Sequence, residues 1–374
     1  MHFYPSLTLL ASSFIGLQLF FVYPTAAVNV TSIADCPAIP ARESGPADAK
    51  DVRIDDIKVI AAMGDSIMAG FGMMGSSSII DPRAFREYRG QSYGIGGDSD
   101  AETMATFTKK FSPDLVGASL GSRSVSLCLT GWCSPTFTYR LTDRLNAAVS
   151  ASTGKNLDNQ LDYLIPEIED RADDFENDWK LINIQIGSND QCASCGASAS
   201  DVTAEKYGQY VSAAVQRIIE NVPNVIVNLM GVFRVSPVYT LTEGQSYCTS
   251  FGDEPLNRQL CSCFQGSDQD RADMDALSDA YNEKLIEIYE SYKNKDSTSY
   301  AVTYQPNNIN IADFPIEAMS NADCFHPSLM SHQWIAKTHW NNLFIPQGYK
   351  PDVHSFDENM EIYCPTETDR IMIN

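Results

Sequence analysis

The sequence is poor in basic residues: 26 Lys and Arg stand against 48 Asp and Glu, a formal net charge of −22 at pH 7. Such an acidic chain is repelled by nucleic-acid phosphates and by anionic membrane surfaces, so neither is expected as a partner. A lipid substrate is still allowed, because apolar contacts do not need basic side chains. The 374 residues contain no internal repeat and no low-complexity linker, which predicts one catalytic domain with loop insertions.

Long apolar runs are missing after residue 27, so no membrane-spanning segment is expected there. Residues 1–27 hold one uncharged apolar run, from Leu7 to Val22, followed by the small residues Thr25-Ala26-Ala27. This pattern predicts a secretory signal peptide, although the usual positive start is missing, and the alternative is a membrane anchor. The signal is favoured because polar residues break the run and the C-terminus lacks an apolar anchor tail. We therefore expect a secreted protein without a stable membrane anchor.

Cysteine, in contrast, is plentiful: ten cysteines fit an oxidising compartment, and their even number permits five disulfides. Cys128–Cys133 and Cys192–Cys195 are predicted as local pairs. A redox or zinc motif is the alternative for the second pair, but no second Cys-x-x-Cys and no nearby histidine accompany it. The single glycosylation sequon, Asn29-Val30-Thr31, follows the predicted cleavage site and also fits an exported glycoprotein.

Strand-like and helix-like apolar segments alternate along the chain. The expected strands are 57–63, 93–98, 181–186, 225–232 and 300–304, and the expected helices are 101–110, 157–179, 202–221, 272–293 and 328–344. This alternation predicts an α/β fold in which a parallel sheet has helices on both faces. The expected plan is a signal peptide at 1–27, an extended lead-in at 28–55, the catalytic domain at 56–348 and a tail at 349–374.

The segment Gly64-Asp65-Ser66 follows the first expected strand, where a helix begins. Gly64 allows a tight turn, and Ser66 is placed at the carboxyl edge of the sheet, where ligands of α/β folds bind. Backbone N–H groups at a helix start also stabilise negative charge, which suits a nucleophile. The alternative is a plain turn in which Asp65 or Ser66 caps the helix. No chemical step is assigned to Asp65.

Histidine is scarce: the chain has five, and four of them lie in its last 50 residues. A serine nucleophile needs a base with a pKa near neutrality, which favours histidine. His326 is the candidate base, because Asp323, three residues earlier, is well placed to accept its Nδ1 proton. His332 and His339 are expected to be packing or surface residues rather than a metal pair, so no metal or cofactor is predicted.

Gly97 and Asn189 follow two further expected strands. Since the carboxyl ends of parallel strands meet at one edge, the N–H groups of Ser66 and Gly97 and the Asn189 amide are expected to form an oxyanion hole. Taken singly, a turn glycine, a capping asparagine and a surface histidine are the simpler interpretations, but their ordered recurrence favours a site. The pattern Gly117-x-Ser119-x-Gly121 also matches a nucleophile elbow and is interpreted as chance, because no helix is expected after it.

Four blocks of the sequence, in this order, resemble the SGNH or GDSL-type hydrolases. They are Gly64-Asp65-Ser66, Gly96-Gly97-Asp98-Ser99, Gly187-Ser188-Asn189-Asp190 and Asp323-Cys324-Phe325-His326-Pro327. The resemblance covers roughly residues 57–345, and the segments around Tyr93 and Cys192 look most like the phospholipase B branch. It implies a three-layer α/β/α, flavodoxin-like fold that needs no metal or cofactor. It also implies Ser66 as nucleophile, His326 as base and acid, Asp323 as its orienting residue, and an oxyanion hole from Ser66, Gly97 and Asn189.

The expected function is that of a secreted serine esterase that hydrolyses acyl esters of phospholipids or lysophospholipids through an acyl-enzyme on Ser66. One alternative is a carbohydrate or short-chain acyl esterase on the same fold, and the other is a catalytically inactive secreted binding protein. Ile67 departs from the family pattern, which usually has Leu after the serine. The sequence leaves the acyl chain, the head group and the oligomeric state open.

Overall fold

The computed structural model describes residue 1 and residues 28–373, apart from 77, 79–80, 127–137, 252–253 and 296. Cys128, Cys133 and residues 2–27 of the predicted signal peptide therefore lie outside the described residues. Among the described helices, none has both the length and the apolar character needed to cross a bilayer.

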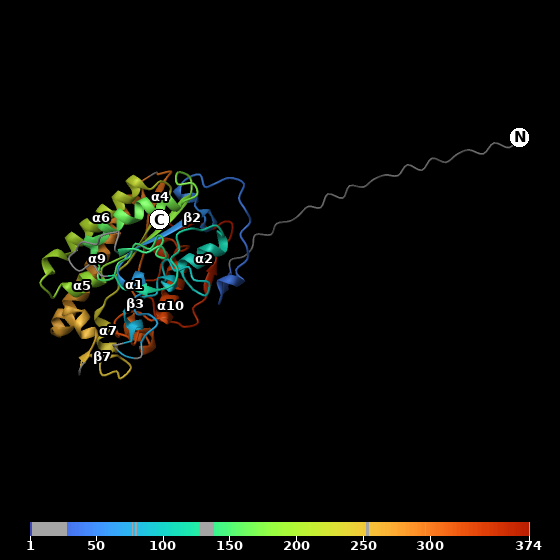
Figure 1. Ribbon diagram of the computed structural model, residues 1–374. Helices are drawn as coiled ribbons and strands as arrows, with labels where there is room; N and C mark the ends of the chain where they lie inside the picture. Colours follow the sequence, from blue (N-terminus) through green and yellow to red (C-terminus); the bar gives the residue numbers. More distant parts are fainter. Residues whose placement is uncertain are drawn as a thin grey trace.

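A four-stranded parallel sheet forms the centre of the molecule (Figure 1). Its strands are β2 (Ile57–Gly64), β5 (Trp179–Gln185), β6 (Val225–Met230) and β9 (Tyr300–Gln305), in the order β2-β5-β6-β9. All residues of β5 and β6 are buried, which explains why these segments lack the alternation of a half-exposed strand. The predicted parallel sheet is confirmed.

A short edge segment, residues 145–149, lies beside β2 and extends the sheet. The Ala62 N–H donates to the Leu145 carbonyl at 3.0 Å, and the Val149 N–H donates to the Gly64 carbonyl at 3.1 Å. With this segment counted as the second strand in chain order, the sheet has the 2-1-3-4-5 order of flavodoxin-like folds. The strand predicted at 93–98 is wrong: these residues mostly form a turn, with one bridge between Gly96 and Ser119.

Helices cover both faces of the sheet, so the predicted three-layer arrangement is confirmed (Figure 1). On one face lie α4 (Leu157–Arg171), α6 (Ala204–Asn221) and α9 (Asp268–Lys293), and on the other α2 (Met104–Phe111) and α10 (Leu329–Asn342). Successive side chains of β2 point to opposite faces, so Met63 joins the apolar core under the first group of helices and Ala62 the core under the second.

The remaining elements are short and connect the main ones. They are α1 (Ser66–Ala69), α5 (Ser188–Ala193), α7 (Ser236–Leu241), α8 (Asn257–Leu260), β3 (Arg86–Glu87), β4 (Arg123–Ser124), β7 (Ser250–Phe251) and β8 (Glu254–Pro255). The helix predicted at 157–179 is too long, because α4 ends at Arg171 and Trp179 already begins β5. Acidic residues follow Arg171, and negative charge is unfavourable at a helix C-terminus.

The two ends of the described chain are joined. β1 (Val28–Val30) pairs antiparallel with β10 (Ile362–Cys364), and Cys36 forms a disulfide with Cys364. The lead-in also buries Val52 and Ile54 in the apolar core. The domain limits at 55 and 348 stay a prediction, but the lead-in is more than an extended segment, because it contributes to the core.

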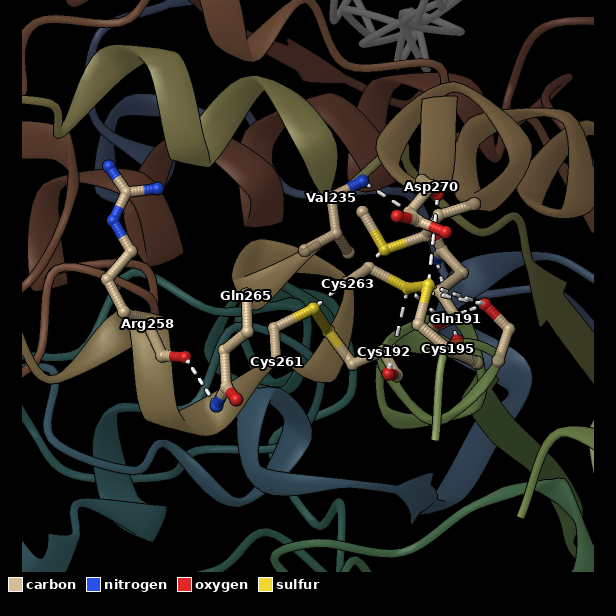
Figure 2. Close-up of a disulfide and its surroundings, with 12 residues drawn as sticks. Gln191, Cys192, Cys195, Val235, Arg258, Cys261, Cys263, Gln265 and Asp270 are labelled. Atoms are coloured by element: carbon tan, nitrogen blue, oxygen red, sulfur yellow. Dashed lines mark hydrogen bonds between the residues drawn. A yellow bond between two sulfur atoms is a disulfide. The ribbon is translucent and has the colours of Figure 1, made fainter. Parts of the chain in front are cut away.

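Three further disulfides fix the loops around the carboxyl edge of the sheet. Cys192 pairs with Cys261, Cys195 pairs with Cys263, and Cys248 pairs with Cys324. The local pair predicted between Cys192 and Cys195 is therefore wrong. Both cysteines, three residues apart, face the segment that carries Cys261 and Cys263, and the two bridges tie α5 and the turn after it to that segment (Figure 2).

Candidate active site

Ser66 is the first residue of α1 and follows a turn that only glycine permits. Gly64 has φ 157°, and a Cβ there would lie 2.3 Å from the Gln185 carbonyl oxygen. The Gln160 side chain of α4 accepts from the Gly64 N–H at 2.9 Å and donates to the Gly64 carbonyl at 2.7 Å. The turn that presents Ser66 is thus fixed by sterics and by hydrogen bonds.

Asp65 caps the short helix, as one of the two sequence interpretations predicted. Its Oδ1 accepts from the Ile67 N–H at 2.9 Å, whereas its buried Oδ2 has no hydrogen-bond partner among the described residues. Burial raises the pKa of Asp65 to about 6. The capping role belongs to Asp65 and leaves the Ser66 hydroxyl available for other contacts.

The structure brings Ser66, His326 and Asp323 together in one line of hydrogen bonds. The distance from His326 Nε2 to Ser66 Oγ is 2.7 Å, and the distance from His326 Nδ1 to Asp323 Oδ2 is 2.5 Å. All three residues are buried, with exposed fractions of 6%, 6% and 4% for Ser66, His326 and Asp323. The Phe71 ring lies against the imidazole at 4.8 Å between centroids. This geometry lets a proton pass from Ser66 to a correctly oriented imidazole.

The Asp323 carboxylate is held by its own loop. Its Oδ1 accepts from the N–H groups of Phe325 and His326 at 2.9 and 3.0 Å. Burial alone raises the pKa of Asp323, but the His326 ring and these hydrogen bonds hold the pKa below its ordinary value. Asp323 is therefore ionised at neutral pH and fixes the orientation of the imidazole.

Cys324, between Asp323 and His326, adopts a left-handed backbone conformation with φ 48°. Such a conformation persists in a non-glycine residue only when its surroundings fix it. Here the Cys248–Cys324 disulfide, a 2.9 Å hydrogen bond from Asn257 Nδ2 to the Cys324 carbonyl and a 2.7 Å bond from the Cys324 N–H to the Ser320 carbonyl do so. The loop is therefore rigid around His326.

Of the predicted oxyanion donors, Ser66 and Asn189 keep an unbonded N–H hydrogen, whereas the Gly97 N–H is already bonded. The Ser66 N–H is at the first position of α1, where no intrahelical acceptor exists. Asn189, in α5, uses one amide hydrogen to bond the Ser152 carbonyl at 2.9 Å. The prediction that the Gly97 N–H is a free donor is wrong, because this N–H already donates to the Ser119 carbonyl at 2.8 Å.

Ala151 follows the edge segment and has a backbone N–H that no sequence pattern indicated as a donor. The edge segment bonds to Gly64 through Val149, and Ser152 bonds to Asn189, so Ala151 lies between these two contacts. Its φ is 66°, and its N–H donates to no acceptor among the described residues. Sequence reasoning missed it, because neither a positive φ nor a free amide is visible in an alanine. The one available signal was the run of small residues from 147 to 152, just before α4.

The other singled-out residues are structural. His332 accepts the Tyr93 N–H on Nδ1 at 3.3 Å, and the His332 and His339 rings both lie within 6 Å of the Tyr93 ring. Burial lowers the pKa of each to about 3, so the rings are neutral packing residues, as predicted. Ser119 donates to the Arg89 carbonyl, and the described residues directly after Gly121, up to 126, contain the short strand β4 (Arg123–Ser124) and no helix. Within the described ranges, no three His, Cys, Asp or Glu side chains are grouped so as to hold a metal ion.

Asp190, next to Asn189, accepts the Gly154 N–H on both carboxyl oxygens at 3.0 and 3.1 Å. Burial raises the pKa of Asp190 to about 7, and the Asp65 charge adds to this. The folded state therefore keeps a proton that the unfolded chain releases at an Asp pKa of about 3.9. Folding stability consequently falls as the pH rises between these two values, through the contribution of this carboxyl.

The Asp190→Asn variant, which has no proton to lose, is expected to lose less stability with rising pH. Between pH 5 and pH 8 its free energy of unfolding should fall by about 1–3 kcal/mol less than that of the parent, as measured by urea unfolding. The exposed Asp357→Asn serves as the matched control and should keep the slope of the parent. An unchanged slope in Asp190→Asn would mean that Asp190 is ionised in the folded state at pH 5.

The sequence model of the family described as GDSL-like Lipase/Acylhydrolase matches residues 60–338, which is most of the chain. The chain belongs to this family. The GDSL-like match spans the elements from β2 to α10 and so includes Ser66, Asn189, Asp323 and His326. This membership places the chain among ester-hydrolysing enzymes and confirms the resemblance seen in the sequence.

Two relatives of this GDSL-like chain carry the name "Phospholipase B1, membrane-associated". The protein from Rattus norvegicus is 29% identical over 349 residues, which cover 89% of this chain and 23% of the relative. The protein from Homo sapiens is 28% identical over 337 residues, which cover 87% of this chain and 22% of the relative. The chain thus spans less than a quarter of the length of these relatives.

Solved structures that are similar to this chain are more distant in sequence. A putative GDSL-like lipase from Parabacteroides merdae is 15% identical with a TM-score of 0.40, and the match covers 78% of this chain and 95% of that one. A variant of an acetyl xylan esterase from Geobacillus stearothermophilus is 14% identical with a TM-score of 0.39, and the match covers 77% of this chain and 96% of that one.

Proposed function

We propose that the chain is a serine esterase that hydrolyses acyl esters through a covalent intermediate on Ser66. The observation that carries the proposal is the hydrogen-bonded line from Ser66 Oγ through His326 to Asp323, with distances of 2.7 and 2.5 Å. This arrangement provides a nucleophile, a base and an orienting carboxylate in the geometry that acyl transfer needs.

In the first half of the reaction, His326 Nε2 takes the hydroxyl proton while Ser66 Oγ bonds to the acyl carbon. His326 then returns the proton to the leaving alcohol, whose bond to the acyl carbon breaks. In the second half, a water molecule gives its proton to His326 and its oxygen to the acyl carbon, and Ser66 leaves as the hydroxyl. The ionised Asp323 stabilises the imidazolium that forms in each half.

Negative charge on the carbonyl oxygen would be stabilised by three donors from separate elements. They are the Ser66 N–H at the start of α1, the remaining amide hydrogen of Asn189 in α5, and the Ala151 N–H at the end of the edge segment. Donors that are oriented before the reaction contribute most, because they need no reorganisation in the transition state. Ala151 replaces Gly97 in this set.

The substrate class that we propose is the acyl esters of phospholipids or lysophospholipids. Support comes from relatives named phospholipase B1 that match 87–89% of this chain. A secreted protein, from which residues 1–27 are removed, fits the four disulfides of the described chain. The acidic charge of −22 is no obstacle to a lipid that is held by apolar contacts.

A short-chain esterase is the second candidate, and one cavity favours it. An almost entirely apolar cavity of about 30 Å³ lies next to the His326 loop and is lined in part by Phe233, Phe325 and Pro327. A cavity of this size fits a short acyl group better than a long chain, for which the lining side chains would have to move.

One substrate panel tests the proposal and separates the two candidates. The purified protein is incubated with palmitoyl-lysophosphatidylcholine, with an acetylated xylo-oligosaccharide, and with p-nitrophenyl esters of acetate, octanoate and palmitate. We expect palmitate release from the lysophospholipid, and a kcat/KM for the octanoyl ester at least about tenfold above that for the acetyl ester. Preferred acetate release would favour the short-chain esterase. No hydrolysis of any ester and no fluorophosphonate labelling of Ser66 would favour a binding protein.

A further inference from the structure

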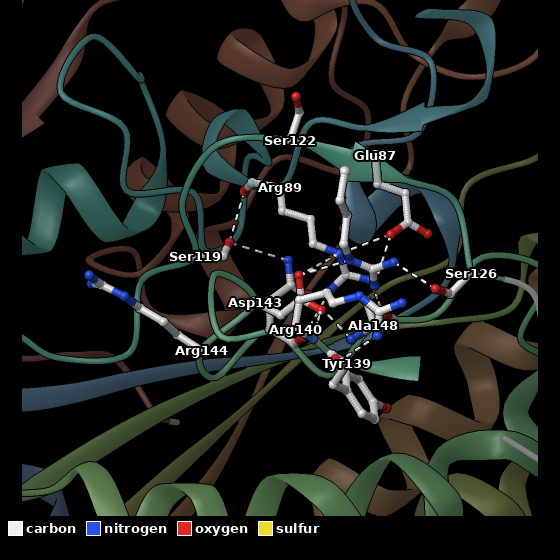
Figure 3. A network of polar contacts seen from close by, with 12 residues as sticks. Glu87, Arg89, Ser119, Ser122, Ser126, Tyr139, Arg140, Asp143, Arg144 and Ala148 are labelled. Carbon is white, nitrogen blue, oxygen red and sulfur yellow. Dashed lines mark hydrogen bonds and ion pairs between the residues drawn. The ribbon is translucent and has the colours of Figure 1, made fainter. Parts of the chain in front are cut away.

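Three buried charged side chains, Glu87, Arg89 and Asp143, lie beside the edge segment (Figure 3). The less buried Arg123 completes a cluster of four. Arg89 Nε lies 2.9 Å from Glu87 Oε2 and 3.4 Å from Asp143 Oδ1. Arg123 lies opposite Glu87 in the β3–β4 pair. Its Nη2 is 3.0 Å from Glu87 Oε2, and its Nε is 2.9 Å from Asp143 Oδ1. Such a cluster contributes little net stability compared with apolar packing, so stability alone does not account for it.

Arg89 fixes the outer edge of residues 145–149. Its Nη1 donates to the Asn146 carbonyl at 2.9 Å, and its Nη2 donates to the Ala148 carbonyl at 2.6 Å. The Ala147 N–H between them donates to the Ala62 carbonyl of β2 at 2.8 Å. The Arg89 guanidinium thus provides the donors that a neighbouring strand would supply at a sheet edge.

Glu87 extends the same support to the residue before Ala151. Its Oε1 accepts from the Ser150 hydroxyl at 2.7 Å, while its Oε2 accepts from Arg89 Nε. On the other side of Ala151, the Ser152 carbonyl is bonded to Asn189. Hydrogen bonds therefore fix the residues on both sides of Ala151, which explains how an alanine keeps a φ of 66°.

We propose that Glu87, Arg89 and Ser150 are positioning residues that aim the Ala151 N–H at the substrate carbonyl oxygen. An alanine that is released from a positive φ relaxes to the negative φ that L-residues prefer, and its N–H turns with it. The buried ion pairs fix the carboxylate of Glu87, Glu87 fixes Ser150, and Ser150 fixes the orientation of the next amide. This inference rests on the proposed function, since it concerns a donor of the same oxyanion hole.

The Ser150→Ala variant tests the proposal, because it removes only the hydroxyl that bonds to Glu87. Ser150 is 2% exposed, so alanine fills its place with little change in packing. We expect kcat on a p-nitrophenyl ester to fall about tenfold with KM within about twofold, since the donor acts mainly in the transition state. The inhibition constant of an alkyl trifluoromethyl ketone, whose adduct on Ser66 carries an oxyanion, should rise by a similar factor.

Ser112→Ala is the matched control. Ser112 is also fully buried, and its hydroxyl bonds Lys58 Nζ at 3.2 Å near the amino end of β2, away from the site. This variant should keep kcat, KM and the inhibition constant within about twofold of the parent. A Ser150→Ala variant with unchanged kcat, or with a loss that Ser112→Ala shares, would overturn the positioning role.

Fluorophosphonate labelling separates this proposal from the proposed function. If Ser66 is labelled and Ser66→Ala is inactive, but Ser150→Ala keeps full kcat, the serine esterase stands and only the positioning role is wrong. If Ser66 is not labelled in the parent protein, the proposed function fails, and the positioning role fails with it.

Discussion

The Ser66→Ala variant is expected to lose about 10⁵–10⁶-fold in kcat for ester hydrolysis. The hydroxyl of Ser66 lies 2.7 Å from His326 Nε2 and is the nucleophile that this base is placed to activate. Alanine leaves the proposed oxyanion donors and the imidazole in place, so only the weak catalysis that these groups give to water remains. Initial rates on a p-nitrophenyl ester, together with fluorophosphonate labelling, measure this loss.

Ser291→Ala is the control for the loss of a serine hydroxyl. Ser291 lies in α9, and its hydroxyl bonds the Ile288 carbonyl of the same helix, so activity and labelling should match the parent. Both variants should unfold at about the temperature of the parent, because neither substitution creates a large cavity. A folded Ser66→Ala protein that keeps activity within about tenfold of the parent, or that still takes up the label, would exclude Ser66 as the nucleophile.

The parts of the site that could be predicted are those encoded by short-range chemistry. An apolar run before Gly64-Asp65-Ser66 specifies a strand, a glycine turn and a helix start, and the structure has all three. The spacing of three residues between Asp323 and His326 lets one side chain bond both the next backbone amides and the imidazole. These features depend on neighbours in sequence, so the sequence pattern was sufficient for them.

The edge of the sheet could not be predicted in the same way. Residues 145–149 contain Asn and Ala, which are depleted in strands, and they are held in place by β2 on one side and Arg89 on the other. Gly97 follows a sequence that is typical of a strand, but its N–H donates to the Ser119 carbonyl. The sequence pattern did not indicate that Ser119 lies beside this segment. Tertiary contacts decided both outcomes: the Gly97 N–H is bonded, whereas the Ala151 N–H has no acceptor among the described residues.

The pairing of the cysteines also could not be predicted from the local sequence. Spacing suggested that Cys192 and Cys195 pair with each other, whereas each pairs with a cysteine nearly 70 residues away. The partners at 261 and 263 lie in a segment between α8 and α9 with no regular pattern, so nothing local placed it against α5. The consequence is functional, because α5 carries Asn189, and the two bridges fix this helix beside the site (Figure 2).

The Asp323→Asn variant is expected to lose about 10⁴-fold in kcat although the substitution keeps the size and shape of the side chain. The asparagine oxygen has to face the N–H groups of Phe325 and His326, which Oδ1 of Asp323 accepts at 2.9 and 3.0 Å. Its NH₂ group then takes the place of Oδ2 and donates to His326 Nδ1. The imidazole is left with its proton on Nε2, where it cannot accept the proton of Ser66.

Two measurements distinguish this change of tautomer from a damaged loop. The thermal midpoint of Asp323→Asn should stay near that of the parent, because the backbone bonds of the loop and the Cys248–Cys324 disulfide remain. Fluorophosphonate should label Ser66 far more slowly, since this reaction also needs His326 as a base. The exposed Asp357→Asn should behave as the parent in both assays. A folded Asp323→Asn protein with kcat within about tenfold of the parent would show that His326 does not depend on Asp323 for its orientation. The catalytic residues would then be Ser66 and His326 alone.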